Sequence, residues 1–259
     1  MQFSTNKLRA VIQRRAARTA AIFDMFPDEA IVIIGFSGGA DSMTLLDILY
    51  MMSRRWRKTI QFVPVYVDAG FFKIAKQKID ALREFCKKRD CELKVIKQHS
   101  ISRIVESGEN PFPPCFTCSR MRRKVLLETA NSLGANLVAL GHHKDDLIET
   151  FFLNILFSRR ISAILPKQPL FKGLFHLIRP FILIDEDYIK RYAKLRAFPV
   201  IEKNCPFAEN TEREWVKKNI ARMEAERPAI KKNIVRSLFY PKPEYLWGEY
   251  RDFAEKLLR

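Results

Sequence analysis

The chain has 259 residues, and 47% of them are hydrophobic, so it has enough apolar material for a buried core and is not of a disordered composition. Its 46 lysines and arginines outnumber 29 acids and give a net charge of +17, which favours an anionic partner, nucleic acid first. No apolar run is long enough to span a membrane, so we expect a cytoplasmic protein without a membrane partner.

Short apolar segments alternate with helical segments over the first two thirds of the chain. The predicted strands are residues 31–37, 62–68, 92–98 and 136–142, and the predicted helices are 7–23, 41–56, 73–89, 119–133 and 144–158. This alternation predicts an α/β fold, a doubly wound parallel sheet with helices on both faces. Ligands bind such sheets at the carboxyl ends of the strands, so we expect the chemistry in the loops that follow them.

The last third of the chain departs from this alternation. Residues 176–183 are predicted to form an edge strand, because Pro180 cannot donate to a strand ladder, and 186–196 a helix. From residue 211 onward the chain is charged and helical in pattern. The expected parts are a basic N-terminal helix over 1–27, an α/β domain over 28–205 and a small helical appendage over 206–259.

The segment Ser37-Gly38-Gly39-Ala40-Asp41-Ser42 joins the first predicted strand to its helix. Its two glycines let the backbone approach an anion closely, and the start of the helix offers unpaired N–H groups. A phosphate site is therefore predicted, with a plain tight turn as the alternative. The spacing matches neither the Walker loop nor the GxGxxG dinucleotide pattern.

This segment resembles the SGGxDS loop of the PP-loop ATP pyrophosphatases. The resemblance implies an enzyme that cleaves ATP between its α- and β-phosphates and attaches AMP to a carbonyl oxygen of the substrate. The residues it implies for nucleotide binding are Ser37, Gly38, Gly39, Asp41, Ser42, Asp68, Gly141 and Asp146. The family usually has lysine at the variable place in this loop, where this chain has Ala40.

A second motif, GHHKDDLIET over residues 141–150, follows the fourth predicted strand. Asp145 and Asp146 lie about one helical turn before Glu149, so the carboxylates can share a face. Acids in a first helical turn are also favoured by the helix dipole alone. The motif resembles the GHxxDDxxET segment of PP-loop enzymes that modify tRNA, which implies a Mg²⁺ ion held near Asp145, Asp146 and Glu149.

Three of the five cysteines form the third pattern. Cys115 and Cys118 make a CxxC pair, and Cys205 follows much later. Three thiolates can hold an iron–sulfur cluster, or a zinc ion with a histidine such as His99, and spacing alone leaves both open.

The segment PCFTCSRMRR over residues 114–123 resembles the PCxxCxxxRR segment of tRNA thiolases of the 2-thiocytidine type. That resemblance implies a 4Fe–4S cluster on Cys115, Cys118 and Cys205, which would act with Asp41 in catalysis. It also implies RNA contacts by Arg122, Arg123 and Arg179. Around Cys205 the chain lacks the second cysteine pair followed by Gly-Ser that these thiolases usually show.

The resemblance as a whole implies adenylation of a tRNA base carbonyl followed by sulfur transfer, most directly to give 2-thiocytidine. The expected partners are ATP, Mg²⁺, tRNA and a sulfur donor, either a cysteine desulfurase or free sulfide, and a homodimer is one expected assembly. Two alternatives remain. One is a PP-loop ligase like tRNA lysidine synthetase, which needs no cysteine trio. The other is a non-enzymatic, zinc-stabilised RNA-binding module.

Overall fold

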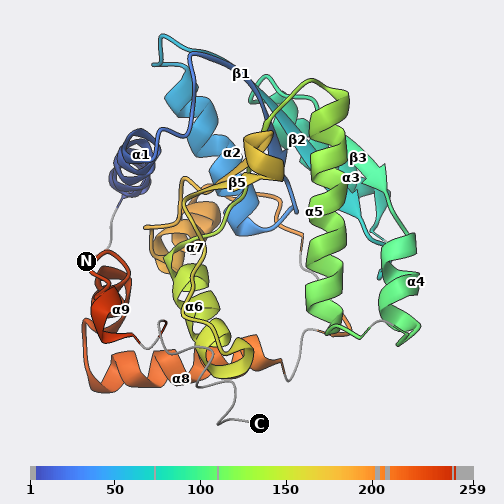
Figure 1. The fold of residues 1–259 in the computed structure, drawn as a ribbon. Helices are drawn as coiled ribbons and strands as arrows, with labels where there is room; N and C mark the ends of the chain where they lie inside the picture. The colour runs from blue at the N-terminus through green and yellow to red at the C-terminus, as the bar shows by residue number, and fades with distance from the viewer. Residues whose placement is uncertain are drawn as a thin grey trace.

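The computed structural model describes residues 4–72, 74–109, 111–201, 205–207, 211–246 and 248. The elements follow in the order α1 (Thr5–Ile22), β1 (Glu29–Gly35), α2 (Ala40–Ser53), β2 (Thr59–Asp68), α3 (Lys76–Lys87), β3 (Lys94–Lys97), α4 (Ser100–Glu106), α5 (Pro114–Ser132), β4 (Leu137–Ala139), α6 (Lys144–Ser158), β5 (Lys167–Leu170), β6 (Phe175–Ile178), α7 (Glu186–Leu195), α8 (Glu212–Glu226) and α9 (Ile230–Ser237) (Figure 1).

The strands form one sheet in the order β3-β2-β1-β4-β6-β5. All neighbours are parallel except β5, which runs antiparallel to β6. The chain leaves β1 toward β2 and β3 and then returns to place β4 on the other side of β1. The predicted doubly wound α/β sheet is therefore confirmed, and the point where the strand order reverses lies between β1 and β4.

Both faces of the sheet are covered, because successive side chains of a strand point to opposite sides. Val32 and Ile34 of β1 pack into a cluster with residues of α1, α2, α3 and α7, while Ile33 packs into a cluster with α4 and α5. Figure 1 shows α1 and α2 on one side of the sheet and α4 and α5 on the other. Burial on both faces explains why β1 has the continuous apolar sequence of a central parallel strand.

The structure corrects three sequence-based predictions. Residues 176–183 do not form the sheet edge: β6 ends before Pro180 and lies inside the sheet, and the edge strand is the unpredicted β5. The helix predicted from residue 119 begins at Pro114, so the CxxC pair lies within a helix and not on a loop. Helix α4 was also not predicted, since its seven residues are too few for a clear apolar period.

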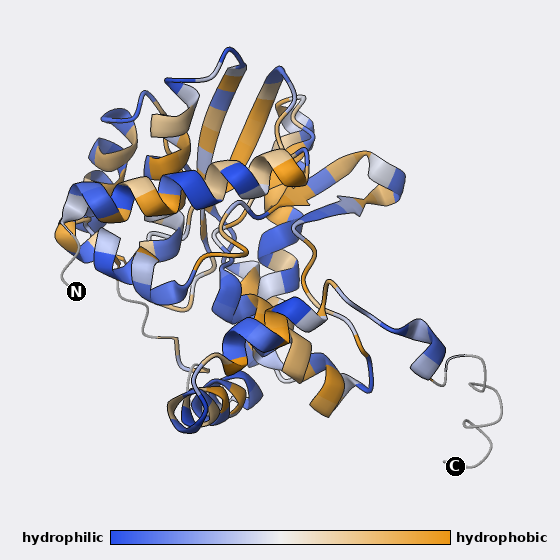
Figure 2. Ribbon diagram, turned by 90° about the vertical axis from the view of Figure 1, so that its left-hand side faces the viewer, coloured by the Kyte–Doolittle hydropathy of each residue, from blue (hydrophilic) through white to orange (hydrophobic). Residues whose placement is uncertain are grey.

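The two ends of the described chain pack against the α/β body. Leu8, Ile12 and Ala16 of α1 are fully buried, and Figure 2 shows hydrophobic and hydrophilic residues alternating along this helix. At the other end, Val216 of α8 and Val235 of α9 join α6 in a separate apolar cluster. No helix of the described residues is long and apolar enough to cross a membrane.

A buried ion pair joins α2, α3 and α7 beneath the sheet face. Arg89 donates to Asp47 Oδ1 through Nε at 2.8 Å and Nη2 at 2.5 Å, and Tyr192 Oη donates to Asp47 Oδ2 at 2.6 Å. All three side chains are almost completely buried. The ion pair is stable only when both residues are present, because either charge alone would be buried without an opposite charge beside it.

We predict that Asp47→Ala destabilises the protein by about 3–5 kcal/mol, because it leaves the Arg89 guanidinium buried without a counter-charge. Urea unfolding followed by circular dichroism measures the change. The exposed pair between Arg83 and Asp80, at 2.9 Å, provides the control, since Arg83→Ala should cost less than about 1 kcal/mol. Equal losses in the two variants would contradict the structural role of this network.

Candidate active site

The loop between β1 and α2 is closed by its two serines. Ser37 N donates to Ser42 Oγ at 3.2 Å, Ser42 Oγ donates to Gly39 O at 3.1 Å, and Gly39 N faces Ser37 Oγ at 3.4 Å. Gly38 has φ +73°, and a Cβ there would lie 3.2 Å from Leu82 Cδ1. No side chain caps the helix at Gly39. The first turn of α2 therefore presents N–H groups and the positive dipole end to an anion.

Gly141 brings the loop after β4 against this phosphate loop. A Cβ on Gly141 would lie 3.1 Å from the carbonyl carbon of Asp41 and 3.2 Å from Ser42 N. The atoms that would have to move are backbone atoms, so the close approach favours glycine at this position. The two motifs recognised in the sequence are thus adjacent in space, at the reversal of strand order.

His143 lies at the centre of four carboxylates. Its Nε2 is 3.4 Å from Asp146 Oδ2, 3.8 Å from Glu186 Oε1 and 4.0 Å from Asp41 Oδ1, and its Nδ1 is 3.9 Å from Asp145 Oδ2. His143 also caps α6: its Nδ1 accepts from Asp146 N, and Asp146 Oδ2 accepts from His143 N at 3.0 Å. One histidine therefore connects the phosphate loop, the acidic helix and the start of α7.

Asp41 is the carboxylate of this group with an unused oxygen. Burial raises its pKa, His143 opposes that shift, and Asp146 and Glu186 add to it. Its Oδ1 is buried and has no hydrogen-bond partner among the described residues. A buried carboxylate oxygen without a hydrogen-bond partner is suited to contact a cation that is bound together with a ligand.

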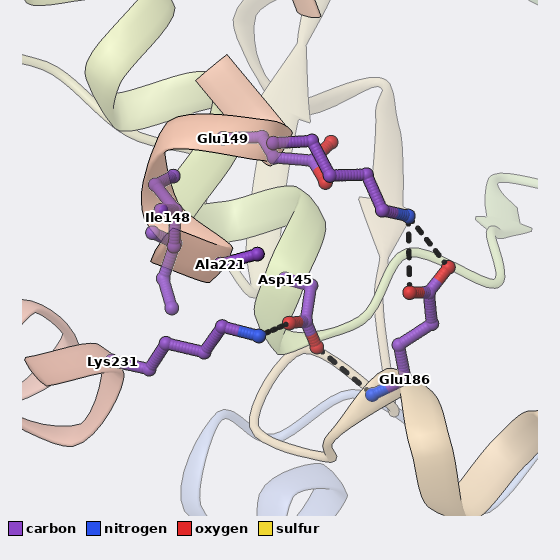
Figure 3. Close-up of a pocket in the computed structure, with 8 residues that line it drawn as sticks. Asp145, Ile148, Glu149, Glu186, Ala221 and Lys231 are labelled. Carbon is purple, nitrogen blue, oxygen red and sulfur yellow. Dashed lines mark hydrogen bonds and ion pairs between the residues drawn. The ribbon is translucent and has the colours of Figure 1, made fainter. Parts of the chain in front are cut away.

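The three predicted magnesium ligands, Asp145, Asp146 and Glu149, are each paired with a cation. Asp145 accepts from Lys231 Nζ at 2.7 Å and from Glu186 N at 2.9 Å. Burial opposes ionisation of Asp145, but these two hydrogen bonds outweigh it and lower its pKa. Figure 3 shows Asp145 between Lys231 and the start of α7. Asp145 therefore links α6 to α7 and α9, and its two carboxylate oxygens are not free to bind a metal.

Glu149 and Asp146 share Arg213. The guanidinium Nη1 donates to Glu149 Oε2 at 2.8 Å and lies 3.4 Å from Asp146 Oδ1. Burial raises the pKa of Glu149, and Arg213 opposes that rise. Among the described residues, no three His, Cys, Asp or Glu side chains form a group that could hold a metal ion. Mg²⁺ on a nucleotide needs only one or two carboxylates, and Asp41, whose Oδ1 has no partner among the described residues, has an oxygen available. Asp146 could join it only by giving up its contact with Arg213.

A small cavity lies where the C-terminal helices meet α6. Its volume is about 200 Å³, and Figure 3 shows residues from several elements around it. The charged residues lining it are Asp145, Glu149, Glu186, Lys217 and Lys231. Acids from α6 and α7 thus face lysines from α8 and α9, which keeps the acidic group neutralised inside the fold.

Two of the three predicted cluster cysteines lie in the first turns of α5, and the third, Cys205, acts electrostatically on Cys115. Cys115 and Cys118 lie about one turn apart on this helix, so their side chains can share a face. Burial raises the pKa of the Cys115 thiol, the neighbouring Cys205 thiol adds to the rise, and Arg213 opposes it. Cys115 Sγ also lies 3.6 Å from Phe207 O, and Cys118 and Phe207 pack on the same apolar cluster. Thiolates are the ligands that iron–sulfur clusters use, so the types of residue fit such a centre, but in the described residues the three thiols do not form a ready-made metal-binding group.

The predicted RNA-contacting arginines differ in their placement. Arg179 is buried, and it donates to His142 Nδ1 at 3.1 Å, Leu165 O at 2.6 Å and Gln168 Oε1 at 3.0 Å. It therefore braces β5 and the loop after β4, and the predicted RNA contact is not supported. Arg122 and Arg123 are half-buried, and Arg122 Nε is buried without a hydrogen-bond partner among the described residues.

Asp68 and His99 interact with each other at the end of β2. Asp68 Oδ2 lies 3.1 Å from His99 Nε2, and Asp68 Oδ1 accepts from Gly70 N at 3.1 Å. The histidine considered as a zinc ligand is therefore engaged with the carboxylate predicted to bind nucleotide.

The comparisons with known proteins agree with this geometry. The PP-loop domain of the ATP_bind_3 family matches residues 9–224. The chain is 34% identical to the tRNA-cytidine(32) 2-sulfurtransferase of Ralstonia nicotianae, over 95% of this chain and 79% of that protein. It is 32% identical to the enzyme of the same name from Pseudomonas putida, over 95% and 89%. This chain belongs to the PP-loop family, on the branch of the tRNA-cytidine 2-sulfurtransferases.

A solved structure extends the likeness in fold. The U34-tRNA thiolase NcsA from Methanococcus maripaludis, described with its [4Fe-4S] cluster, superposes with a TM-score of 0.75 at 21% identity. The match covers 91% of this chain and 78% of that one. At this identity the likeness shows the PP-loop fold alone.

Several residues of the site in this PP-loop protein were not predicted from the sequence. They are Glu186, Arg213, Lys217 and Lys231, all on α7, α8 and α9. In the sequence, these charged residues are typical of solvent-exposed helix faces, because the oppositely charged residues that they contact lie far away along the chain. One local signal existed: Thr211 caps α8 by accepting from Glu214 N at 3.2 Å, which places Arg213 in a first helical turn.

We predict that the folding stability of this PP-loop protein decreases in mild acid because His142 is held neutral in the native state. Burial, opposed by Asp146 and aided by three arginines, lowers the pKa of His142 to about 4. The native state therefore resists protonation of His142, whereas the unfolded state takes up the proton near pH 6.5. This contribution is fully present above pH 6.5 and is lost as pH falls toward 4, by at most about 1.4 kcal/mol per pH unit.

The His142→Asn variant keeps an acceptor for Arg179 Nε but cannot titrate. Unfolding free energies at pH 7 and pH 5 should therefore differ less in this variant than in the unchanged protein. The same loss of stability in both proteins would show that His142 does not carry the effect.

Proposed function

We propose that this protein uses ATP to adenylate a carbonyl oxygen of a tRNA base, most directly cytidine, and replaces that oxygen with sulfur. The observation that carries the proposal is the position of Arg213. This side chain contacts Asp146 and Glu149 of the acidic helix and acts electrostatically on Cys115. One side chain therefore lies in contact with the acidic helix and within electrostatic range of Cys115, as a thiolation reaction at one site requires.

In this reaction the first turn of α2 holds the phosphates of ATP through its N–H groups and through Ser37 and Ser42. Asp41 and Asp146 support the Mg²⁺ ion that neutralises the phosphates. The base oxygen attacks the α-phosphorus, pyrophosphate leaves, and the oxygen becomes part of a phosphate ester. That ester is a far better leaving group than the carbonyl oxygen it replaces.

Cys115, Cys118 and Cys205 are the residues that would hold a 4Fe–4S cluster. When bound, such a cluster supplies an open iron that can carry the sulfur to be transferred. The chain's own contribution is to supply the three thiolates, of which Cys115 lies within electrostatic range of Arg213. The sulfur donor we propose is a cysteine desulfurase or free sulfide, and a second copy of the chain is the proposed assembly.

The basic surface is proposed to hold the tRNA backbone. Arg14 and Arg18 lie exposed about one turn apart on α1, on the face opposite the buried Leu8 and Ile12. Arg122 and Arg123 on α5 follow the CxxC pair, and the buried Nε of Arg122 lacks a partner among the described residues. Guanidinium groups in such positions suit phosphate, which they can bind with two parallel hydrogen bonds.

We predict that Cys115→Ser abolishes sulfur transfer and lowers iron content, because one of three thiolate ligands is lost. Anaerobic purification followed by iron analysis, visible absorption and mass spectrometry of tRNA nucleosides measures both effects. Cys91→Ser is the matched control: Cys91 donates to Arg89 O at 3.1 Å, and a serine hydroxyl can make the same bond. This control should keep its iron and its activity.

The same experiment separates the alternatives. A lysidine synthetase would keep its activity in Cys115→Ser and would attach lysine to the tRNA. A zinc-stabilised binding module would contain zinc and would release no pyrophosphate with ATP and tRNA. Either result would overturn the proposal.

We also predict that tRNA binding weakens steeply as salt rises, because backbone contacts release counterions. Replacing Arg14 or Arg18 by alanine should reduce the slope of log affinity against log salt by about 1 for each residue. Filter binding or fluorescence anisotropy over a salt series measures this slope. An unchanged slope in both variants would exclude α1 from the RNA-binding surface.

A further inference from the structure

The phosphate loop of this protein lacks a cation of its own. Residues 37–42 include Asp41 but no lysine or arginine, since position 40 is alanine. Around the loop, Asp146 and Glu186 both raise the pKa of Asp41, so negative charges already repel one another there. A polyphosphate bound at the start of α2 adds to that repulsion, and a cationic side chain nearby would offset the part that Mg²⁺ leaves.

Lys190 on α7 is placed to supply that charge. Its Nζ lies 2.7 Å from Glu186 Oε1. The same oxygen lies 3.8 Å from His143 Nε2, and His143 Nε2 lies 4.0 Å from Asp41 Oδ1. Three consecutive short contacts thus connect the ammonium group to the phosphate loop, and its positive charge lowers the pKa of Asp41.

The surroundings of Lys190 allow it to change partner. Its side chain is 54% exposed, so its four-carbon stem can move without disturbing the core. Glu186 does not depend on Lys190, because Lys217 Nζ of α8 binds both of its carboxylate oxygens, at 3.0 and 3.1 Å. The ammonium group can therefore leave Glu186 without leaving a carboxylate unpaired.

We propose that Lys190 is the phosphate-binding cation of this site and takes the place of the lysine that position 40 lacks. In the nucleotide complex its Nζ binds the polyphosphate of ATP, while Lys217 keeps Glu186 paired. The inference rests on the proposed function, because it requires ATP at the start of α2. It assigns a positioning and binding role to a residue more than a hundred positions away from the phosphate loop.

The test is the affinity for Mg·ATP, measured by calorimetry on the full chain. tRNA is left out, so that a change in RNA binding cannot alter the measured affinity. Lys190→Ala should weaken binding about tenfold, the usual order for one charge-assisted contact. Lys194→Ala, one turn further along α7 and also exposed, removes the same charge from the same helix and should change nothing. Lys217→Ala should weaken binding less than Lys190→Ala does, because it affects only Glu186.

A rescue variant makes the test decisive. Adding Ala40→Lys to Lys190→Ala returns a cation to the loop and should restore most of the lost affinity. Affinity unchanged by Lys190→Ala, an equal loss in Lys194→Ala, or a double variant as weak as Lys190→Ala would each overturn the inference. The proposed function would survive those results, whereas an unchanged protein that fails to bind Mg·ATP would overturn both.

Discussion

The contact between Gly141 and the backbone of Asp41 and Ser42 is the constraint on which the rest of the site depends. It joins the loops after β1 and β4, the two strands between which the sheet reverses its strand order. A side chain at Gly141 would press on the backbone of Asp41 and Ser42 and force these loops apart by a few tenths of an ångström. The position of the site therefore follows from the topology of the sheet. The connections that leave neighbouring strands diverge where the strand order reverses, which leaves a crevice between β1 and β4, and Gly141 lets the two loops approach each other there.

Charge balance is the second requirement. The start of α6 and α7 gathers Asp145, Asp146, Glu149 and Glu186 in a partly buried space, and the cations that neutralise them come from α8 and α9 as well as from α7. Replacing the cations of α8 and α9 by neutral side chains would leave buried carboxylates such as Glu149 without a counter-charge, which is unfavourable. The C-terminal helices are thus a necessary part of the acidic site.

Much of the fold could be predicted from the sequence, because β1, β2 and the helices after them carry strong local patterns. The phosphate loop and the acidic helix were predicted as well, since each lies within one strand–turn–helix unit. The placement of Arg179 was not: a charged side chain in sequence reads as a surface group, and only the paired acceptors around it explain its burial. Arg213 and Lys231 were not predicted for a related reason. Their partners lie on another helix, and residue spacing within one helix cannot identify such partners.

The two outer strands of the sheet have a consequence for the protein's behaviour at high concentration. β3 is only four residues long and has an exposed lysine at each end, Lys94 and Lys97, while β5 contains Pro169, which has no N–H to offer. Short length, lysine and proline are the features that prevent an outer strand from recruiting another chain by continuing the ladder. Both edges of the sheet are therefore poor templates for a strand of another chain.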